Sequence, residues 1–145
     1  MPPREVVVGT VTVTDDASRL DLDLAHRALS RDSYWAEGRR REVTEAAFAA
    51  SRVAVALDGS GATVGFARAV TDGVTFAYLC DVWVEPAHRG AGIGVAIVQH
   101  LTEADDLVDI RRWTLATADA HELYRRFGFD DMEPDLWMQR RGSTI

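Results

Sequence analysis

The distribution of apolar and polar residues along the chain predicts where its strands lie. Residues 5–13 (EVVVGTVTV) alternate as expected of one strand with a buried and an exposed face. Three apolar runs follow in the middle of the chain, at 52–57, 62–70 and 74–84. Because the segments that separate them, DGSG and TDG, are typical of tight turns, these runs predict an antiparallel β-meander.

Helical spacing marks two segments before the meander. Leu20, Leu24 and Ala28 recur at intervals of four behind a group of acidic residues, which favours a helix. Thr44 and Glu45 open a shorter helix that leads into the first run of the meander. Residues 33–43 between these helices are predicted to form a loop.

After the meander the pattern changes to strands that alternate with helices. A third helix is predicted from about 91 to 104, a strand at 110–117 and a short helix at 119–127. The apolar face of the third helix would consist of Ile93, Ile97, Leu101 and Ala104. A helix between two strands predicts a right-handed parallel βαβ crossover. Two short terminal strands are expected at 128–132 and 136–140, so the fold class is α/β with a mixed, α+β-like sheet.

Composition narrows the functional classes. A length of 145 residues suits one domain, and a net charge of −7 speaks against a general nucleic-acid binder. All 16 basic residues are arginine, which excludes a lysine Schiff base and the lysine of a P-loop. No apolar stretch is long enough for a membrane span. One cysteine, Cys80, excludes an internal disulfide and fits a reducing, cytoplasmic location.

The segment HRGAGIG, residues 88–94, lies between an apolar strand and the third helix. The first backbone N–H groups of a helix lack partners within the helix, and glycines let a phosphate approach them closely. A dinucleotide fingerprint counted from Gly90 would need a third glycine where Val95 stands, and a P-loop would need lysine. The segment therefore predicts a pyrophosphate cradle, and the alternative is a flexible turn that eases packing.

The stretch VWVEPAHRGAGIGVAIVQHL, residues 82–101, resembles the acyl-CoA-binding segment of the GNAT superfamily of N-acetyltransferases. The signature Q/R-x-x-G-x-G/A of that family is met by Arg89, Gly92 and Gly94. The order of elements resembles the same fold along nearly the whole chain. The resemblance implies one N-acetyltransferase domain over residues 1–145, with an antiparallel meander, a parallel βαβ crossover and a splayed strand pair.

The same resemblance implies how acetyl-CoA would be held. The pantetheine arm would lie between the splayed strands and pair with the backbone of Val82 and Val84. Thr117 stands where many members have an asparagine that contacts coenzyme A, and its hydroxyl can still donate a hydrogen bond. The pyrophosphate would lie on the backbone of Arg89, Gly90, Ala91, Gly92, Ile93 and Gly94.

Acetyl transfer to an amine needs an acid that protonates the departing thiolate. A tyrosine, with an ordinary pKa of about 10, is still protonated at neutral pH. By resemblance the general acid is Tyr124, four residues before Gly128, on the predicted helix 119–127. The alternative is that Tyr124 is a half-buried packing residue of an amphipathic helix.

The group that takes the proton of the amine has several candidates. Asp81 is a lone carboxylate in an apolar strand, which would be costly without a partner, and the alternative is an edge or solvent-facing position. Histidine ordinarily changes charge near neutral pH, so His121 is a second candidate, with a structural role as the alternative. Cys80 lacks the histidine–acid pattern of a covalent acyl-enzyme. The histidines show no metal-ligand spacing, so no metal is expected.

Tyr34 and Trp35 adjoin in the loop between the first two helices, where exposed aromatics would be wasteful. In the GNAT family this connection lines the acceptor pocket, so both residues are expected to bind the acceptor amine, unless they plug the core instead. The segment GRRR, residues 38–41, is interpreted as a solvated loop and not as a nucleic-acid patch.

The sequence thus predicts direct acetyl transfer from acetyl-CoA to a primary amine of a small molecule. Two alternatives stay open, which are acetylation of a protein or peptide N-terminus and a non-catalytic acyl-CoA-binding module. A nucleic-acid or membrane partner is not expected. A homodimer is possible, because the terminal strands are short and apolar.

Overall fold

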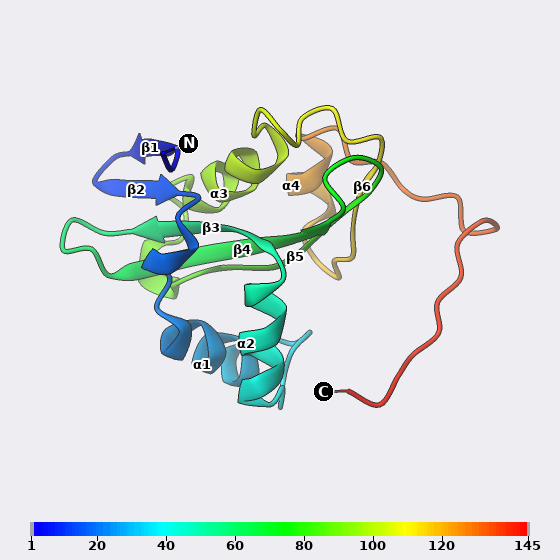
Figure 1. Cartoon of the computed structure of the whole chain (residues 1–145), viewed down its shortest axis with the longest axis horizontal. Coiled ribbons are helices and arrows are strands. Elements are labelled where there is room, and N and C mark those ends of the chain that lie inside the picture. Colours follow the sequence, from blue (N-terminus) through cyan, green and yellow to red (C-terminus); the bar gives the residue numbers. More distant parts are fainter. Residues whose placement is uncertain (1, 145) are drawn as a thin grey trace.

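The computed structural model describes residues 2–144, and its centre is a six-stranded sheet in the order β1-β2-β3-β4-β5-β6 (Figure 1). Neighbouring strands are antiparallel from β1 to β5, whereas β5 and β6 are parallel. The strands are β1 Glu5–Val8, β2 Val11–Thr14, β3 Arg52–Leu57, β4 Thr63–Thr71, β5 Ala77–Val84 and β6 Trp113–Leu115. The predicted meander and parallel crossover are confirmed.

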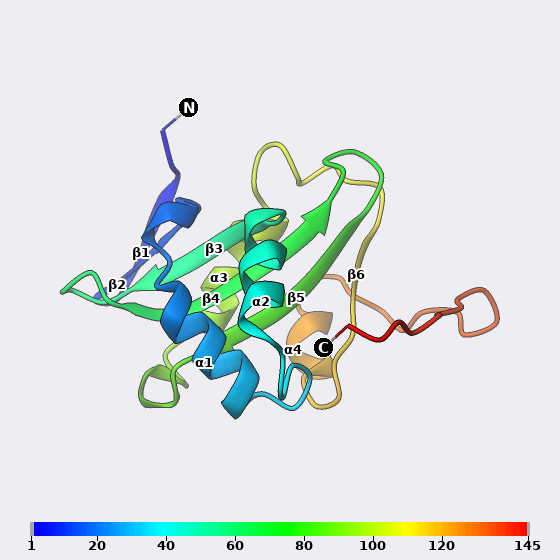
Figure 2. The ribbon, with the colours of Figure 1, turned by 60° about the horizontal axis from the view of Figure 1, so that its bottom comes forward.

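Helices cover both faces of this sheet. The helices are α1 Leu22–Asp32, α2 Arg41–Ala49, α3 Ile93–Thr102 and α4 His121–Arg125, with short 3₁₀ turns at Ala17–Arg19 and Pro86–His88. Figures 1 and 2 show α1 and α2 on one face of the sheet and α3 and α4 on the other. The protein therefore has three layers, with the sheet in the middle. No helix within residues 2–144 is long and apolar enough to cross a bilayer.

The core has one hydrophobic cluster on each face of the sheet. On the α1–α2 side, Leu29 and Phe48 pack against Phe66 and Trp83 of β4 and β5. On the other side, the predicted face of α3 is buried, since Ile93, Ile97 and Leu101 are at most 3% exposed, and Ala104 is buried just beyond the end of the helix. Strand β3 (RVAVAL) is buried on both faces, which explains why its sequence is continuously apolar rather than alternating.

Two sequence predictions about the ends of the chain are wrong. Residues 5–13 form a hairpin rather than one strand, because Gly9 at φ 63° turns the chain between Val8 and Val11, which pair with each other. The expected strands 128–132 and 136–140 are absent, and residues 126–144 contain no helix or strand. Leu136 and Met138 are 72% and 97% exposed, so their apolar pattern has no surface to pack against.

Candidate active site

The pairing between β5 and β6 stops part-way along β5. The two strands pair from Ala77 with Trp113 to Leu79 with Leu115, whereas β5 continues to Val84. Figure 2 shows the two strands diverging. The splayed strand pair that the sequence predicted is therefore present, and it leaves an opening beside the second half of β5.

Strand β5 is bulged where this opening begins. The pairing register shifts so that Asp81 and Val82 of β5 together face Ala67 of β4. Asp81 has φ 52°, which is the one positive φ of a non-glycine residue within residues 2–144. A left-handed backbone costs such a residue about 1–2 kcal/mol, so other contacts must hold Asp81 in place.

Those contacts occupy both oxygens of the Asp81 carboxylate. Oδ2 accepts hydrogen bonds from Arg39 Nη1 and Arg68 Nε, both at 2.7 Å. Oδ1 accepts from Trp35 Nε1 at 2.9 Å and from Arg39 Nη2 at 3.2 Å. Burial alone would raise the pKa of Asp81, but the hydrogen bonds and charges of the two arginines outweigh it and lower that pKa. The carboxylate stays ionised and fully engaged, which favours a positioning role over proton transfer.

The interpretation of residues 38–41 as a solvated loop is wrong for Arg39, which is nearly buried, and for Arg41, which begins α2. The Arg39 side chain is 14% exposed and pairs with Asp81, whereas the Arg40 side chain is 62% exposed. Sequence reasoning also missed Arg68, whose guanidinium lies 5.8 Å from the centre of the Phe48 ring. The signal was available, because a carboxylate inside an apolar strand requires buried cations nearby.

The loop between α1 and α2, residues 33–40, crosses the opening as a strap. At one end it is anchored to β5 through the Trp35–Asp81 hydrogen bond. The Tyr34 hydroxyl accepts a hydrogen bond from the Ala118 N–H at 2.9 Å, on the segment that follows β6. The Tyr34 and Trp35 rings meet edge to face, with centroids 5.0 Å apart. The strap thus connects the two diverging strands on the side of α1 and α2.

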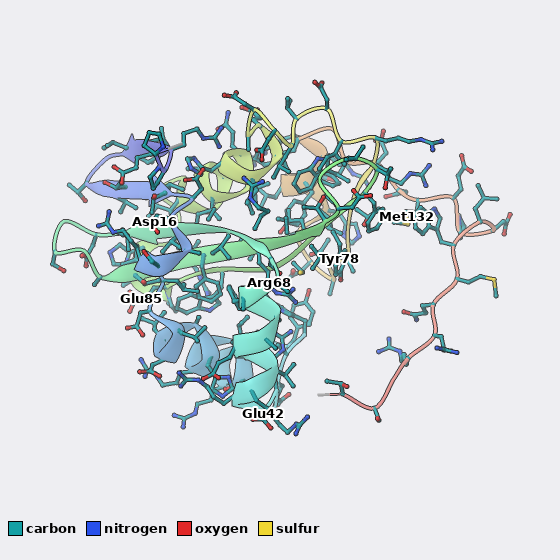
Figure 3. All side chains as sticks on the ribbon, in the orientation of Figure 1. Asp16, Glu42, Arg68, Tyr78, Glu85 and Met132 are labelled. Carbon is teal, nitrogen blue, oxygen red and sulfur yellow. The ribbon has the colours of Figure 1, made fainter. Side chains whose placement is uncertain are left out.

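Two cavities share part of their lining at the end of β6 and at Tyr124, and only the first includes residues of β5. The first cavity has a volume of about 390 Å³ and lies under the strap. We refer to it as the acceptor-side cavity, because the sequence predicts that the acceptor binds beside Tyr34 and Trp35. It is lined by Tyr34, Trp35, Tyr78, Leu79, Cys80, Asp81, Val82, Leu115, Ala116, Thr117, Ala118, Asp119, Ala120 and Tyr124. A second cavity of about 560 Å³ lies between β6, α4 and the C-terminal segment. Tyr78 borders the first and Met132 the second, and both are labelled in Figure 3.

Tyr124 borders both cavities. It is 9% exposed and packs edge to face on Phe129, with ring centroids 6.1 Å apart. Burial, with smaller effects from Tyr34 and Asp119, raises the pKa of Tyr124 to about 12. Among residues 2–144 its hydroxyl has no hydrogen-bond partner within 3.5 Å. The phenol is therefore protonated at neutral pH and free to donate into the opening.

The GF pair after Tyr124, Gly128 and Phe129, forms the turn that ends α4. Gly128 has φ 87°, and this turn lets the Phe129 N–H donate to the Tyr124 carbonyl at 3.3 Å. A glycine at this position ends a helix because it adopts the left-handed conformation without strain. The chain reversal brings the Phe129 ring back onto Tyr124 and fixes the position of the phenol.

His121 and Thr117 flank Tyr124 but differ in position. His121 is exposed at the start of α4 and borders the second cavity, and it is not part of the acceptor-side lining. Thr117 borders both cavities, and its Oγ1 accepts from the Ala120 N–H at 3.1 Å. The Thr117 hydroxyl therefore shapes the turn into α4 and keeps its proton available for another acceptor.

Cys80 lies beside the acceptor-side cavity with a thiol that is poorly suited to nucleophilic attack. Burial raises the pKa of Cys80 to about 11, although Arg68 lowers it in part. Its Sγ donates weakly to the Tyr78 carbonyl at 3.9 Å, and no histidine side chain is among its hydrogen-bond partners in residues 2–144. The thiol is thus a protonated, half-buried group.

The glycine segment forms the predicted turn into α3. Gly90 and Gly92 have φ 84° and 81°, and Gly92 is the residue that caps α3. Within the described part of the chain, the N–H groups of residues 90–95 donate no hydrogen bond to another backbone or side-chain group. Arg89 Nε donates to the Val84 carbonyl at 2.8 Å, which leaves the outer guanidinium nitrogens exposed. These unpaired donors and the adjacent cation suit a pyrophosphate, so the residues fit coenzyme A.

The family model of the acetyltransferase (GNAT) domain matches residues 49–131, which is more than half of the chain. The chain belongs to the GNAT acetyltransferase family. A GNAT-family structure from Xanthomonas campestris pv. campestris, described as an acetyltransferase, is 39% identical and superposes with a TM-score of 0.89. That alignment covers 94% of this chain and 96% of the other.

Two further proteins are similar to the chain. A Gibberella zeae protein described as an acetyltransferase is 32% identical over 151 residues, which cover 89% of this chain and 84% of the relative. An aminoglycoside N-acetyltransferase solved in complex with CoA shares the fold, with a TM-score of 0.62, 14% identity and 98% coverage of both chains. The chain is thus an acyltransferase of the N-acetyltransferase type, and its family uses acetyl-CoA.

Proposed function

We propose that this GNAT protein transfers the acetyl group of acetyl-CoA to a primary amine of a small molecule by direct attack. The observation that carries the proposal is the place of Tyr124, which lines the acceptor-side cavity at the opening between β5 and β6. A donor that enters from the side of α3 and α4 and an acceptor that enters under the strap would meet at this phenol.

In the proposed reaction the amine nitrogen forms a bond to the acetyl carbon while the carbon–sulfur bond breaks. Tyr124 donates its proton to the departing sulfur, which a phenol with a pKa of about 12 holds ready throughout the neutral range. An ammonium substrate loses two protons in all. One compensates for the proton that Tyr124 gives to sulfur, and the other passes to water.

The residues proposed to hold the donor surround the same opening. The unpaired N–H groups from Gly90 to Gly94 and the Arg89 guanidinium would bind the pyrophosphate. Val82 and Val84 lie on β5 beyond its last pair with β6, where a pantetheine arm would find unpaired backbone. Thr117 lies across the opening and would donate its hydroxyl proton to the coenzyme.

The base of the reaction stays a prediction. The contacts of Asp81 support a role in positioning the strap, because a carboxylate that accepts hydrogen bonds from two arginines takes up a proton poorly. His121 borders the second cavity, whose lining contains no residue of β5 or of the glycine turn, and it is not part of the acceptor-side lining. Loss of the amine proton to water through the acceptor-side cavity requires neither residue.

The strap supports a small acceptor over a polypeptide. Tyr34 and Trp35 line the acceptor-side cavity, and the Tyr34–Ala118 hydrogen bond joins its two banks. A polypeptide lying across the opening would have to break this contact, whereas a compact amine fits a volume of about 390 Å³. A non-catalytic acyl-CoA-binding module is disfavoured by the free, protonated Tyr124 hydroxyl.

The test is a screen for thiol release from acetyl-CoA across small amines, amino acids and short peptides with free N-termini. Acetylated products are identified by mass spectrometry. The proposal expects release with one or more small amines and none with the peptides. Release with peptides alone supports N-terminal acetylation, and binding of acetyl-CoA without release from any compound supports the non-catalytic module.

The possible homodimer rested on terminal strands that residues 126–144 do not form, so it stays a prediction. A cytoplasmic location likewise stays a prediction from the single cysteine.

A further inference from the structure

The two carboxylates that line the acceptor-side cavity differ in whether a cation of the protein already pairs with them. Asp81 and Asp119 are the two carboxylates of the lining. The charge of Asp81 is matched by Arg39 and Arg68 at 2.7 Å. Asp119 is exposed, and among residues 2–144 its carboxylate pairs with no arginine or histidine within 4.0 Å. Among the described residues, Asp119 is therefore the lining carboxylate whose charge no arginine or histidine matches.

The backbone around Asp119 is fixed by the same contacts that close the strap. The Asp119 N–H donates to Thr117 Oγ1 at 3.4 Å, and the neighbouring Ala118 N–H donates to the Tyr34 hydroxyl at 2.9 Å. The Tyr34 ring in turn packs on Trp35. Asp119 thus lies at the rim of the cavity beside aromatic side chains, and a carboxylate together with aromatic rings is a favourable setting for a cation.

Asp119 is badly suited to the nitrogen that reacts. That nitrogen must lose its positive charge before it attacks, and a neighbouring carboxylate favours the charged form. Tyr124, where the acetyl group is transferred, is 9% exposed, whereas Asp119 is on the surface two residues before α4. A group that keeps its positive charge therefore suits Asp119 better than the reacting nitrogen does.

We propose that Asp119 binds a second positive group of the acceptor, so that the preferred substrates are small molecules with two cationic nitrogens. This inference rests on the proposed function, since it names the substrate class of the same site. In a diamine, one nitrogen binds Asp119 and the rings of the strap at the rim, while the other enters as far as Tyr124 and is acetylated. Asp119 is then a specificity-determining residue that takes no part in the transfer itself.

The test compares α,ω-diamines with monoamines of equal length, for example 1,6-diaminohexane with hexylamine, in the wild type and in Asp119→Asn. For the wild type we expect kcat/KM about tenfold higher for the best diamine, which is the size of an exposed ion pair combined with a cation–π contact. In Asp119→Asn this preference is lost, because kcat/KM for the diamine falls to the value for hexylamine. Asp109→Asn, an exposed carboxylate away from both cavities, is the matched control and keeps the preference.

A binding measurement separates this inference from the proposed reaction. Calorimetry measures the affinity of 1,6-diaminohexane for the complex of the protein with CoA. Asp119-dependent binding without any turnover supports the site and contradicts the proposed reaction. Turnover in which diamines and monoamines perform alike, or a diamine preference that survives in Asp119→Asn, overturns the inference and leaves acetyl transfer intact. Absence of diamine binding to the wild type also overturns it.

Discussion

Replacing Asp81 with asparagine would remove the charge that holds two nearly buried arginines. The side chains of Arg39 and Arg68 are 14% and 13% exposed, and that of Asp81 is 1% exposed. Removing one partner of a buried ion pair typically costs about 3–5 kcal/mol. Asparagine can still accept a hydrogen bond from Trp35, so we expect the lower end, about 3 kcal/mol of unfolding free energy. For a chain of this length that lowers the melting temperature by roughly 6–12 °C.

Urea denaturation followed by circular dichroism measures this loss. The matched control is Asp106→Asn, because Asp106 pairs with Arg52 at the same 2.7 Å but in an exposed position. An exposed pair contributes about 0–1 kcal/mol, so the control should lose little stability. Equal losses in the two variants would refute the reasoning, since they would mean that the Asp81 cluster is solvated in solution.

The pH dependence of the same difference gives an independent check. The pKa of Asp81 is lowered in the folded protein, so its stabilisation is complete above its unfolded pKa of about 3.9. The stabilisation is lost as the pH falls through the lower, folded pKa. The difference between wild type and Asp81→Asn should therefore be constant from pH 6 to 8 and shrink only below about pH 4. A difference that changes near neutral pH would instead indicate a raised pKa and a base.

Two further predictions concern the donor site and the cysteine. Gly92→Val should abolish binding of acetyl-CoA in calorimetry, because φ 81° disfavours a β-branched residue and the side chain would cover the N–H groups of the turn. The control is Gly73→Val, at φ 80° in a hairpin away from both cavities, which should leave binding intact. Normal binding by Gly92→Val would contradict the cradle. Alkylation of Cys80 by iodoacetamide at pH 8, followed by mass spectrometry, should be on the order of tenfold slower than that of free cysteine. The rate should increase with pH up to about 11, because burial raises the pKa of the thiol to that value. A midpoint near pH 8 would show that the thiol is not buried as described.

The elements that depend on local patterns could be predicted from the sequence. The apolar face of α3 and the turn chemistry of the meander are local features, and both are found as expected. The glycine turn was also accessible, because the spacing of Arg89, Gly92 and Gly94 together with the strand before it suffices to place it. The local pattern gave a wrong prediction for the C-terminal segment, because apolar residues such as Leu136 are exposed there and form no strand.

Contacts between distant segments could not be read from the sequence. Asp81 stood out as a costly charge, but its partners lie 42 and 13 residues away along the chain and become neighbours only once the strap folds against β5. Asp119 gave no signal, since an acidic residue in a polar turn is ordinary. Its significance follows from the cavity that it borders and from the neutralisation of Asp81 by two arginines.

The proton donated by Tyr124 is the centre of the account, and Tyr124→Phe tests it most directly. The measurement is kcat with the best amine of the screen, together with the dissociation constant of acetyl-CoA from calorimetry. A general acid contributes about 100-fold or more, so kcat should fall by at least that factor while the dissociation constant changes by no more than about twofold. An unchanged kcat would contradict the account, because the acetyl group would then be transferred without the phenol that borders both cavities.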